Sequence, residues 1–341
     1  MKIRTVFSAL FLAGAAALSA QSHTLKLATI APARSTWDVE ERILAQDWAK
    51  STGGKIQVQF MNSNAMGGEN SVIQKLNSVR PGQKAPIDGA IFTNIGVENL
   101  APDAHILTLA VPFMFRDQEE VDLVLDTFEP RFSKAIGKKG YVLLGWFNVG
   151  WAYFYTKKPV HTPQDLKTQK LSVAGVGLPA LSNAFKAAGF LTEDISADKL
   201  LQSTKTPGGV EGFYTIAMYA YAGQYYKSLP YILDMPLCPV MAALVISEKT
   251  WSSISPDMQK AMMGGVERAK ANFISAQRSS DSEYIQKCVE GGCTLVKLTP
   301  AERKVMEDTL RGDASAMIKT GLIDQQFYND VDTLLRKHRG E

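Results

Sequence analysis

The sequence predicts an α/β protein with mixed sheets flanked by helices and folded into two lobes. Strand-like and helix-like stretches alternate from residue 24 onwards, an order typical of a mostly parallel sheet with helices on both faces. A second series of strands begins at residue 141. The chain of 341 residues is also longer than one hydrophobic core usually serves.

The first part of the chain contains three expected strands and two expected helices. Ser35 is the expected N-cap of the first helix, because Asp38 follows at the third position, and Gly53 and Gly54 end that helix. The expected strands lie at 24–30, 55–60 and 87–92, and the helices at 35–51 and from residue 69.

The rest of the chain repeats this alternation and ends in long helices. Thr162 begins one helix, with Pro163 at the first helical position. Strands are expected at 141–146, 151–155, 170–174 and 241–247, and helices from 162, from 179 to 188, and from 256 towards 288. We predict a first lobe from 21–149 and 238–275, and a second lobe with the C-terminal helices from 150–237 and 276–341.

Residues 1–20 have the pattern of a secretory signal peptide. Lys2 and Arg4 precede an apolar run from 6 to 18, and the small residues Ser19 and Ala20 follow. The run is shorter than the roughly 20 residues that span a bilayer. We therefore predict export to the periplasm with cleavage near Ala20, and the alternative is a buried N-terminal helix.

Composition and cysteines narrow the class of protein. A net charge of +3 without runs of like charge predicts no nucleic-acid partner. Cys288 and Cys293 flank a turn-like segment, which predicts a disulfide in an oxidising compartment, although two free thiols also fit. Cys238 lies in an apolar stretch and is expected to be a buried small hydrophobe.

Catalytic motifs are absent from the sequence. No Gly-x-Ser-x-Gly, His-Glu-x-x-His or Gly-x-x-x-x-Gly-Lys pattern occurs, and the four histidines lack metal-ligand spacing. We therefore expect no enzyme, cofactor or metal. The segment 175–180 matches Gly-x-Gly-x-x-Ala, which we interpret as a loop lining a cleft, and an exported nucleotide-using enzyme is the alternative.

Aromatic residues gather in two segments, 146–155 and 213–221. Such residues pack protein cores, but as a set they also fit an apolar ligand site, because small-molecule pockets are mainly hydrophobic and aromatic.

Seven short segments carry a resemblance to a known family. Each is weak alone, but their order and spacing are specific. They are 54–58, 62–69, 111–117, 158–160, 162–167, 210–212 and 246–251. Through them the chain, from about 25 to 298, resembles the substrate-binding subunits of TRAP (tripartite ATP-independent periplasmic) transporters.

The resemblance implies a fold and a mode of action. The fold would be the two-lobed, type II-like periplasmic-binding-protein fold, with a long helix at 256–288 that spans both lobes. Hinge closure would bury a small-molecule ligand in the interlobe cleft. Integral membrane permease subunits of the TRAP type would then receive the ligand, and some relatives also work with a periplasmic helical-repeat (TPR-like) protein.

The sequence departs from the family at its ligand-binding positions. Two family arginines that grip a carboxylate fall at Ala152 and Ser172, a family asparagine falls at Thr215, and a polar position falls at Ile30. An arginine holds a carboxylate by two charged hydrogen bonds, which alanine and serine cannot form. Burying a carboxylate without such a partner costs several kcal/mol. We therefore predict an uncharged, hydrophobic ligand whose affinity comes from apolar contacts.

Ten residues are predicted to bind this ligand. They are Ile30, Thr93, Trp146, Trp151, Ala152, Ser172, Phe213, Tyr214, Thr215 and Met218. One alternative is a carboxylate ligand held by Arg34 or Lys75, and another is a cleft that has lost its ligand altogether.

Overall fold

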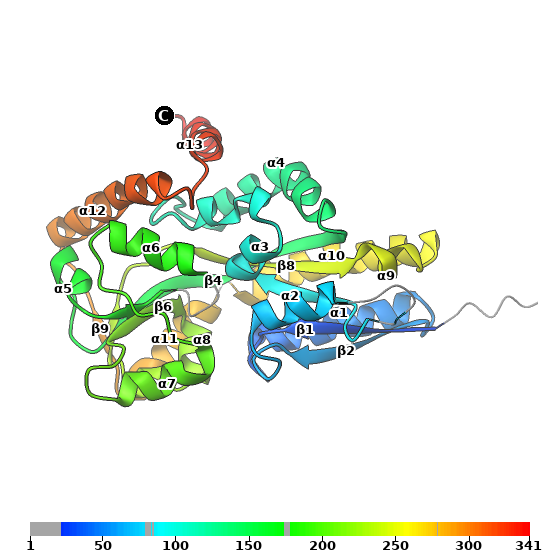
Figure 1. Ribbon diagram of the computed structural model, residues 1–341, viewed down its shortest axis with the longest axis horizontal. Helices are drawn as coiled ribbons and strands as arrows, with labels where there is room; N and C mark the ends of the chain where they lie inside the picture. Colours follow the sequence, from blue (N-terminus) through cyan, green and yellow to red (C-terminus); the bar gives the residue numbers. More distant parts are fainter. Residues whose placement is uncertain (1–21, 79–82, 84, 174–177, 278) are drawn as a thin grey trace, which may run out of the picture.

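The computed structural model describes residues 22–78, 83, 85–173, 178–277 and 279–341. The predicted signal peptide and the glycines of the 175–180 loop lie outside the described residues. The two-lobed α/β fold is confirmed: a mixed sheet flanked by helices extends across both halves of the molecule (Figure 1).

The first lobe is built on a five-stranded mixed sheet in the order β2-β1-β3-β8-β4. β1 is parallel to β2 and β3, whereas β8 runs antiparallel to β3 and β4. The strands are β1 (His23–Thr29), β2 (Ile56–Asn62), β3 (Gly89–Thr93), β4 (Tyr141–Thr156) and β8 (Pro239–Ser247). Its helices are α1 (Thr36–Ser51), α2 (Glu69–Asn77), α3 (Asn94–Leu100), α4 (Gln118–Gly137), α9 (Glu248–Ser252) and α10 (Pro256–Gln277), with the 3₁₀ turns η1 (Pro102–Ala104) and η2 (Ile106–Ala110).

The second lobe continues from the far half of β4. There β4 pairs with β6 and β7, β5 is parallel to β6, and β9 is parallel to β7. The strands are β5 (Leu171–Ser172), β6 (Gly212–Ile216), β7 (Tyr231–Leu233) and β9 (Thr294–Val296). The second-lobe helices are α5 (Pro163–Lys167), α6 (Pro179–Ala187), α7 (Ala197–Lys205), α8 (Ala217–Ala222), α11 (Ser280–Glu290) and α12 (Pro300–Lys319), with the 3₁₀ turn η4 (Tyr225–Lys227). The last helix of the chain is α13 (Gln325–Arg339).

Helix starts follow the predicted capping chemistry. The Ser35 hydroxyl accepts a hydrogen bond from the Asp38 amide at 3.2 Å. Thr162 forms a complete capping box with Asp165, and Pro163 occupies the first helical position, as expected.

β4 differs from the prediction because it is one strand of 16 residues rather than two. Its register against β8 shifts between Leu143 and Gly145 and again between Asn148 and Gly150. Each shift interrupts the period-two pattern, and the second one falls in the gap between the two predicted strands. β4 therefore runs continuously from one lobe into the other (Figure 1).

The helical stretch expected from 256 towards 288 is divided into α10 and α11. α10 packs against α1 in the first lobe, and α11 packs against α8 in the second lobe. Ser279 is the residue before α11. The stretch therefore serves both lobes as two helices.

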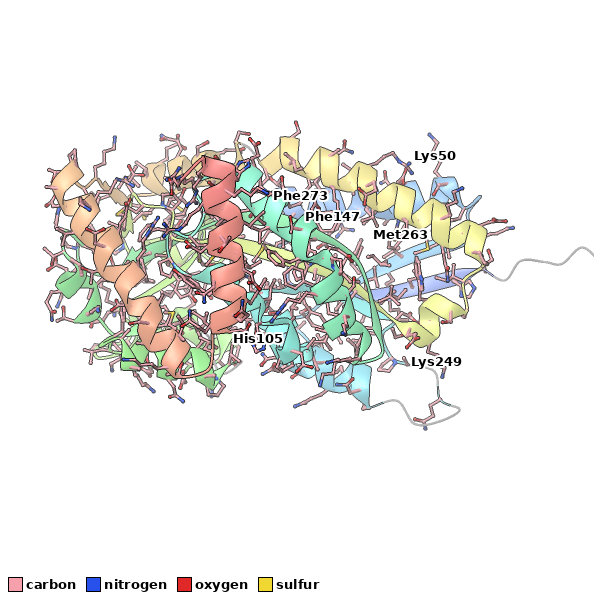
Figure 2. All side chains as sticks on the ribbon, turned by 90° about the horizontal axis from the view of Figure 1, so that it is seen from above. Lys50, His105, Phe147, Lys249, Met263 and Phe273 are labelled. Atoms are coloured by element: carbon pink, nitrogen blue, oxygen red, sulfur yellow. The ribbon has the colours of Figure 1, made fainter. Side chains whose placement is uncertain are left out.

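The C-terminal helix α13 differs from the predicted boundary, which placed 276–341 in the second lobe. Phe327 of α13 packs edge-to-face on Phe128 of α4, with ring centroids 5.0 Å apart, so α13 belongs with the first lobe (Figure 2). α12, in contrast, packs on α5 and α6. The two C-terminal helices thus connect the lobes (Figure 1).

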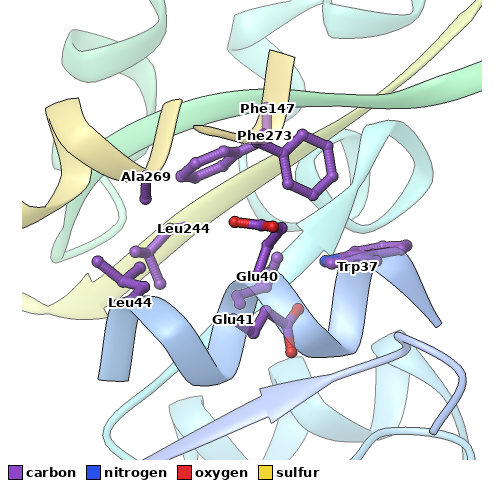
Figure 3. Close-up of a pocket in the computed structure, with 9 residues that line it drawn as sticks. Trp37, Glu40, Glu41, Leu44, Phe147, Leu244, Ala269 and Phe273 are labelled. Atoms are coloured by element: carbon purple, nitrogen blue, oxygen red, sulfur yellow. The ribbon is translucent and has the colours of Figure 1, made fainter. Parts of the chain in front are cut away.

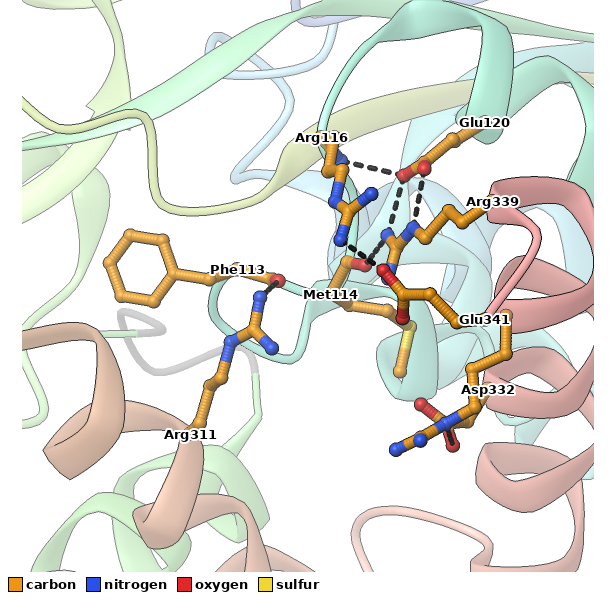
Figure 4. Close-up of polar contacts among 9 residues, drawn as sticks. Phe113, Met114, Arg116, Glu120, Arg311, Asp332, Arg339 and Glu341 are labelled. Atoms are coloured by element: carbon orange, nitrogen blue, oxygen red, sulfur yellow. Dashed lines mark hydrogen bonds and ion pairs between the residues drawn. The ribbon is translucent and has the colours of Figure 1, made fainter. Parts of the chain in front are cut away.

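A cluster of charged side chains fixes both C-terminal helices to the loop between η2 and α4 (Figure 4). Arg311 of α12 donates to the Phe113 carbonyl at 2.5 Å. Arg339 of α13 donates to the Met114 carbonyl at 2.8 Å and also binds Glu120. Arginines from both C-terminal helices therefore bind backbone carbonyls of the same short loop.

The predicted disulfide is absent, because Cys238, Cys288 and Cys293 are all free and buried. The Cys293 thiol instead faces the Tyr226 carbonyl at 3.4 Å. Burial raises the pKa of Cys288 to about 12 and that of Cys293 to about 11. Cys238 is a buried small hydrophobe, as expected.

Candidate ligand-binding site

The two lobes meet where β1 and β3 end, and residues from both lobes pack together there. Carboxyl ends of parallel strands are the usual place for ligands in α/β sheets. Ile30, which follows β1, packs against the same hydrophobic cluster as the buried Met218 of α8. Trp151 of β4 packs against one cluster from each lobe. We call this region the lobe junction.

Glu69, the first residue of α2, places a carboxylate beside the end of β3. Its Oε1 accepts from the Thr93 amide at 2.6 Å, and its Oε2 accepts from the Thr93 hydroxyl at 2.7 Å. Burial raises the pKa of Glu69, although these hydrogen bonds oppose the shift. The amide and the hydroxyl of Thr93 therefore both donate to Glu69.

A polar contact joins the lobes directly. The side chain of Asn64, in the loop after β2, lies close enough to the Tyr219 hydroxyl, on α8, to lower the pKa of that hydroxyl. The Tyr219 ring also stacks on Tyr225, with centroids 6.0 Å apart and planes 17° apart. Burial raises the pKa of Tyr219, and the nearby Glu69 adds to the shift. The described arrangement therefore has the lobes in contact.

The junction holds carboxylates without cations. Asp281 of α11 accepts from the Trp151 amide at 2.8 Å, and burial raises its pKa to about 7. Among the described residues, no cation lowers the pKa of Glu69 or Asp281. Lys75 donates to the Met66 carbonyl at 3.4 Å within the first lobe. The backbone amide of Arg34 donates to Asp38.

Ala152 and Ser172, which the resemblance predicts to stand in place of family arginines, are buried and uncharged. Ala152 is fully buried, and its amide donates to the Cys238 carbonyl at 2.9 Å. Ser172 is 5% exposed and lies opposite Phe213 in the β5–β6 pair. Neither side chain can hold a carboxylate by charge.

An apolar cavity lies on the Ala152 side of the β4–β6 pair, among residues of η2, α6, β6 and α12. Its wall includes Tyr214, whose ring stacks on Phe185 with centroids 5.8 Å apart and planes 12° apart. Ala152 belongs to the same hydrophobic cluster as several wall residues. The wall consists of Leu107, Ala110, Pro112, Leu181, Phe185, Tyr214, Leu237, Met317, Leu322 and Ile323.

Two predicted ligand-binding residues lie elsewhere. Trp146 is buried in the first-lobe core, where it packs edge-to-face on Phe132 at 5.3 Å. Phe213 is buried in the second-lobe core beside Tyr225, at 4.7 Å. Successive residues of a strand face opposite sides of the sheet, and aromatic clustering alone does not reveal the side. Thr215 is partly buried opposite Tyr153 in the β4–β6 pair.

A second cavity lies inside the first lobe, between α1 and α10 (Figure 3). The carboxylate of Glu40 points towards Phe147 and Phe273, whereas Glu41 points to the opposite side of α1. Burial raises the pKa of both carboxyl groups. Every wall residue belongs to the first lobe or to the first-lobe part of β4 and β8, and several wall residues share one hydrophobic cluster with Met218 of the lobe junction.

Sequence reasoning did not select several polar residues of the junction. Asn64 and Glu69 both belong to the segment 62–69 that carries the family resemblance, and their position after a strand was a usable signal. Tyr219 lies in the aromatic segment 213–221 but is not among the ten predicted residues, and Asp281 lies on a helix whose sequence gives no comparable signal. Within the described ranges, His, Cys, Asp and Glu nowhere gather in threes as a metal site requires, and no helix is long and apolar enough to span a membrane.

Comparison with known families decides what kind of protein carries this junction. The model of "bacterial extracellular solute-binding protein, family 7" matches residues 27–320. The chain belongs to this family. The predicted relation to TRAP substrate-binding proteins is thereby confirmed. This is a family of solute-binding proteins rather than of enzymes.

The similarity of this solute-binding protein to a curated relative covers most of its length. It is 26% identical over 322 residues to the 2,3-diketo-L-gulonate-binding periplasmic protein of Escherichia coli (strain K12), covering 91% of this chain and 92% of the relative. Two solved structures show the same fold.

One is a TRAP periplasmic solute-binding protein from Sulfitobacter sp. NAS-14.1 with bound β-D-galacturonate, with a TM-score of 0.79, 16% identity, and coverage of 92% of this chain and 100% of that chain. The other is a TRAP periplasmic solute-binding protein from Sulfurospirillum deleyianum DSM 6946 with bound succinate, with a TM-score of 0.79, 18% identity, and coverage of 92% and 99%.

Proposed function

We propose that this solute-binding protein captures an uncharged, largely apolar small molecule at the lobe junction and delivers it to a TRAP-type membrane permease. Export to the periplasm and, as in some relatives, cooperation with a periplasmic helical-repeat protein belong to the same proposal. The observation that carries it is the charge of the junction, where Glu69 and Asp281 have no cationic partner among the described residues.

A carboxylate ligand would meet an unfavourable environment there. Moving an ionised carboxylate out of water costs several kcal/mol unless a cation and hydrogen bonds compensate. Ala152 and Ser172 offer no charge, and both carboxyl oxygens of Glu69 accept from Thr93, so Glu69 supplies no cation for an anion either. An apolar ligand avoids this cost.

Apolar surface supplies the favourable term for such a ligand. Burial of apolar surface contributes roughly 25 cal/mol per Å² before the entropic costs of association. Ile30, Trp151 and Met218 offer such surface at the lobe junction, and Tyr214, Phe185 and Leu237 offer it in the separate apolar cavity of the second lobe. Hinge closure would bring the junction residues around the ligand.

Two of the solved relatives contain acids, galacturonate and succinate, which makes a carboxylate ligand the competing function. In that case a cation such as Arg34 would have to reach the ligand. The two functions differ in charge, and salt dependence therefore separates them.

Calorimetric titration with succinate and galacturonate, at low and high salt, is the decisive test. We expect no binding of either acid to the natural protein, and we expect solvent extraction followed by mass spectrometry to release a neutral organic molecule. The double change Ala152→Arg and Ser172→Arg should create acid binding that weakens with salt, while the matched change Lys205→Arg on the surface of α7 should not. Tight, salt-sensitive binding of either acid to the natural protein would overturn the proposal.

A further inference from the structure

β4 changes its course where it passes between the lobes. Its register against β8 shifts between Asn148 and Gly150, and Gly150 has a φ of +136°, which L side chains rarely adopt. Trp151, the next residue, packs against a hydrophobic cluster from each lobe. The backbone at this crossing therefore determines where the indole lies.

One side chain from outside the strand fixes this backbone. Asp281, in the first turn of α11, accepts from the Trp151 amide through Oδ2 at 2.8 Å. Its Oδ1 lies 3.4 Å from Gln277 Nε2 at the end of α10. A Cβ atom at Gly150 would come within 2.6 Å of Asp281 Oδ1. Asp281 is thus packed against the crossing itself and touches both helices of the divided stretch.

The surroundings of Asp281 contain titratable groups but no compensating cation among the described residues. Tyr153 and Tyr155 of β4 face it, and Asp281 contributes to the raised pKa of both. Asp234, after β7, also acts on Tyr153. Burial raises the pKa of Asp281 to about 7, and the hydrogen bond from Trp151 only partly opposes the shift.

We propose that Asp281 is a positioning residue for ligand capture, which holds Trp151 between the lobes and links the end of α10 and the start of α11 to the bend in β4. The inference rests on the proposed capture of a ligand at the junction. Asp281 touches no ligand in this role and acts through the backbone of Trp151.

The coupling depends on the protonation state of Asp281. A protonated carboxyl can still accept from the Trp151 amide. The Oε1 atom of Gln277 is buried without a partner among the described residues. If the side-chain amide of Gln277 is rotated by 180°, this Oε1 atom can accept from the O–H of the protonated Asp281. The ionised carboxylate is penalised by burial, so rising pH favours arrangements in which Asp281 meets water. Protonation therefore stabilises the described junction, and ionisation loosens it.

Distances between spin labels on the two lobes test this inference without any ligand. Labels would be placed at Lys50→Cys on α1 and Lys205→Cys on α7, both exposed, while the three native cysteines are buried. Pulsed electron spin resonance would compare pH 5.5 with pH 8.5. We expect the labelled protein that carries no other change to show a narrow distance distribution at pH 5.5 and a broader, shifted distribution at pH 8.5.

Three variants make the test specific to Asp281. Asp281→Asn should remain narrow at both pH values, since it keeps an acceptor for the Trp151 amide but cannot ionise, and Asp281→Ala should be broad at both. Glu98→Gln is the matched control, because burial raises the pKa of Glu98 to about 7 as well, but its carboxylate accepts from the Leu107 amide rather than at the crossing.

Loss of the pH-dependent shift in Asp281→Asn, with the shift kept in Glu98→Gln, supports the proposal. Equal distributions for Asp281→Ala and the parent protein at both pH values would overturn it, as would an unchanged shift in Asp281→Asn. Because Asp281→Asn preserves size and acceptor, it keeps the test available if Asp281→Ala does not fold. Failure of the proposed ligand class would appear in the extraction and titration experiments and not in these distances.

Discussion

Arg339 binds Glu120 through two parallel hydrogen bonds, from Nε at 2.6 Å and from a terminal nitrogen at 2.7 Å. Both side chains are nearly inaccessible, with 8% and 3% of their surface exposed. This two-point contact fastens the end of α13 to the start of α4 (Figure 4). Burial alone would raise the pKa of Glu120, but Arg339 and the Arg116 amide lower it overall.

Arg339→Ala should lower the free energy of unfolding by about 3–5 kcal/mol, because it leaves a buried carboxylate without its partner. Urea unfolding at pH 7 measures this. Arg336→Ala is the control, since Arg336 is exposed and pairs with Asp332 on the surface, where a pair contributes less than about 1 kcal/mol. The lowered pKa of Glu120 means that this stabilisation is present above its ordinary pKa and is lost in stronger acid. Similar losses for the two variants would contradict the prediction.

Glu41 should make the protein less stable as pH rises. Its Oε1 accepts from the Thr29 hydroxyl at 2.7 Å, while burial raises its pKa to about 8 from an ordinary value of 4.5. Between these values the folded protein retains a proton that the unfolded chain has lost, so the stability contributed by this group falls with rising pH and is lost near pH 8. Glu41→Gln should flatten the dependence.

Urea unfolding at pH 5, 6, 7 and 8 measures the slope that Glu41 contributes. The expected difference in slope between the parent protein and Glu41→Gln is at most about 1.4 kcal/mol per pH unit. Glu119→Gln serves as the control, because the Glu119 side chain is 81% exposed. Parallel curves for the parent protein and Glu41→Gln would show that the carboxyl is ionised in the folded state at neutral pH.

Gly150→Ala should destabilise the crossing of β4. The φ of +136° is unfavourable for alanine, and the new Cβ would lie 2.6 Å from Asp281 Oδ1 and 3.0 Å from Gln277 Nε2. Backbone strain of this kind costs on the order of 1–3 kcal/mol. Gly312→Ala, in the interior of α12 with open space around its Cβ, should instead stabilise by about 0.5–1 kcal/mol. Thermal unfolding of both variants would reveal the opposite signs, and a shift in the same direction would refute this account.

The three thiols should be unreactive in the folded protein. All are buried, and burial raises the pKa of Cys238 and Cys288 to about 12, so the nucleophilic thiolate is scarce at pH 8. A thiol-reactive dye should therefore label the native protein slowly and label three cysteines per chain in denaturant without a reductant. Labelling of one cysteine alone under those denaturing conditions would mean that Cys288 and Cys293 are joined.

Local chemistry made much of the fold predictable from sequence. Ser35 with Asp38, and Thr162 with Asp165, mark helix starts by side-chain bonds that involve only neighbours. β4 escaped this reasoning, because its register shifts depend on pairing with β8, roughly a hundred residues away in the chain. The position of α13 was unpredictable for the same reason, because its apolar face packs on α4, which is distant in the sequence and comes close only in the folded chain.

The structure brings together only some of the predicted ligand-binding residues, and their binding role stays a prediction. Trp151 and Met218 lie where the lobes meet, but Trp146 and Phe213 face the cores, a choice set by the direction of each side chain from its strand. Asp281 could not be found from sequence, since its importance arises from contact with a backbone amide 130 positions away. Pattern reasoning therefore located the region better than it located the contacts.

The shared strand β4 also limits how this protein can be rearranged by genetic engineering. Because β4 and β8 pair with each other and α12 and α13 lead back across the molecule, neither half corresponds to one uninterrupted stretch of the gene. A chimaera that borrows the ligand-contacting half of a relative would need matched splice points in β4, before β8 and between α10 and α11. Evolution of new specificity in such an architecture is accordingly expected to proceed by point substitutions rather than by exchange of whole modules.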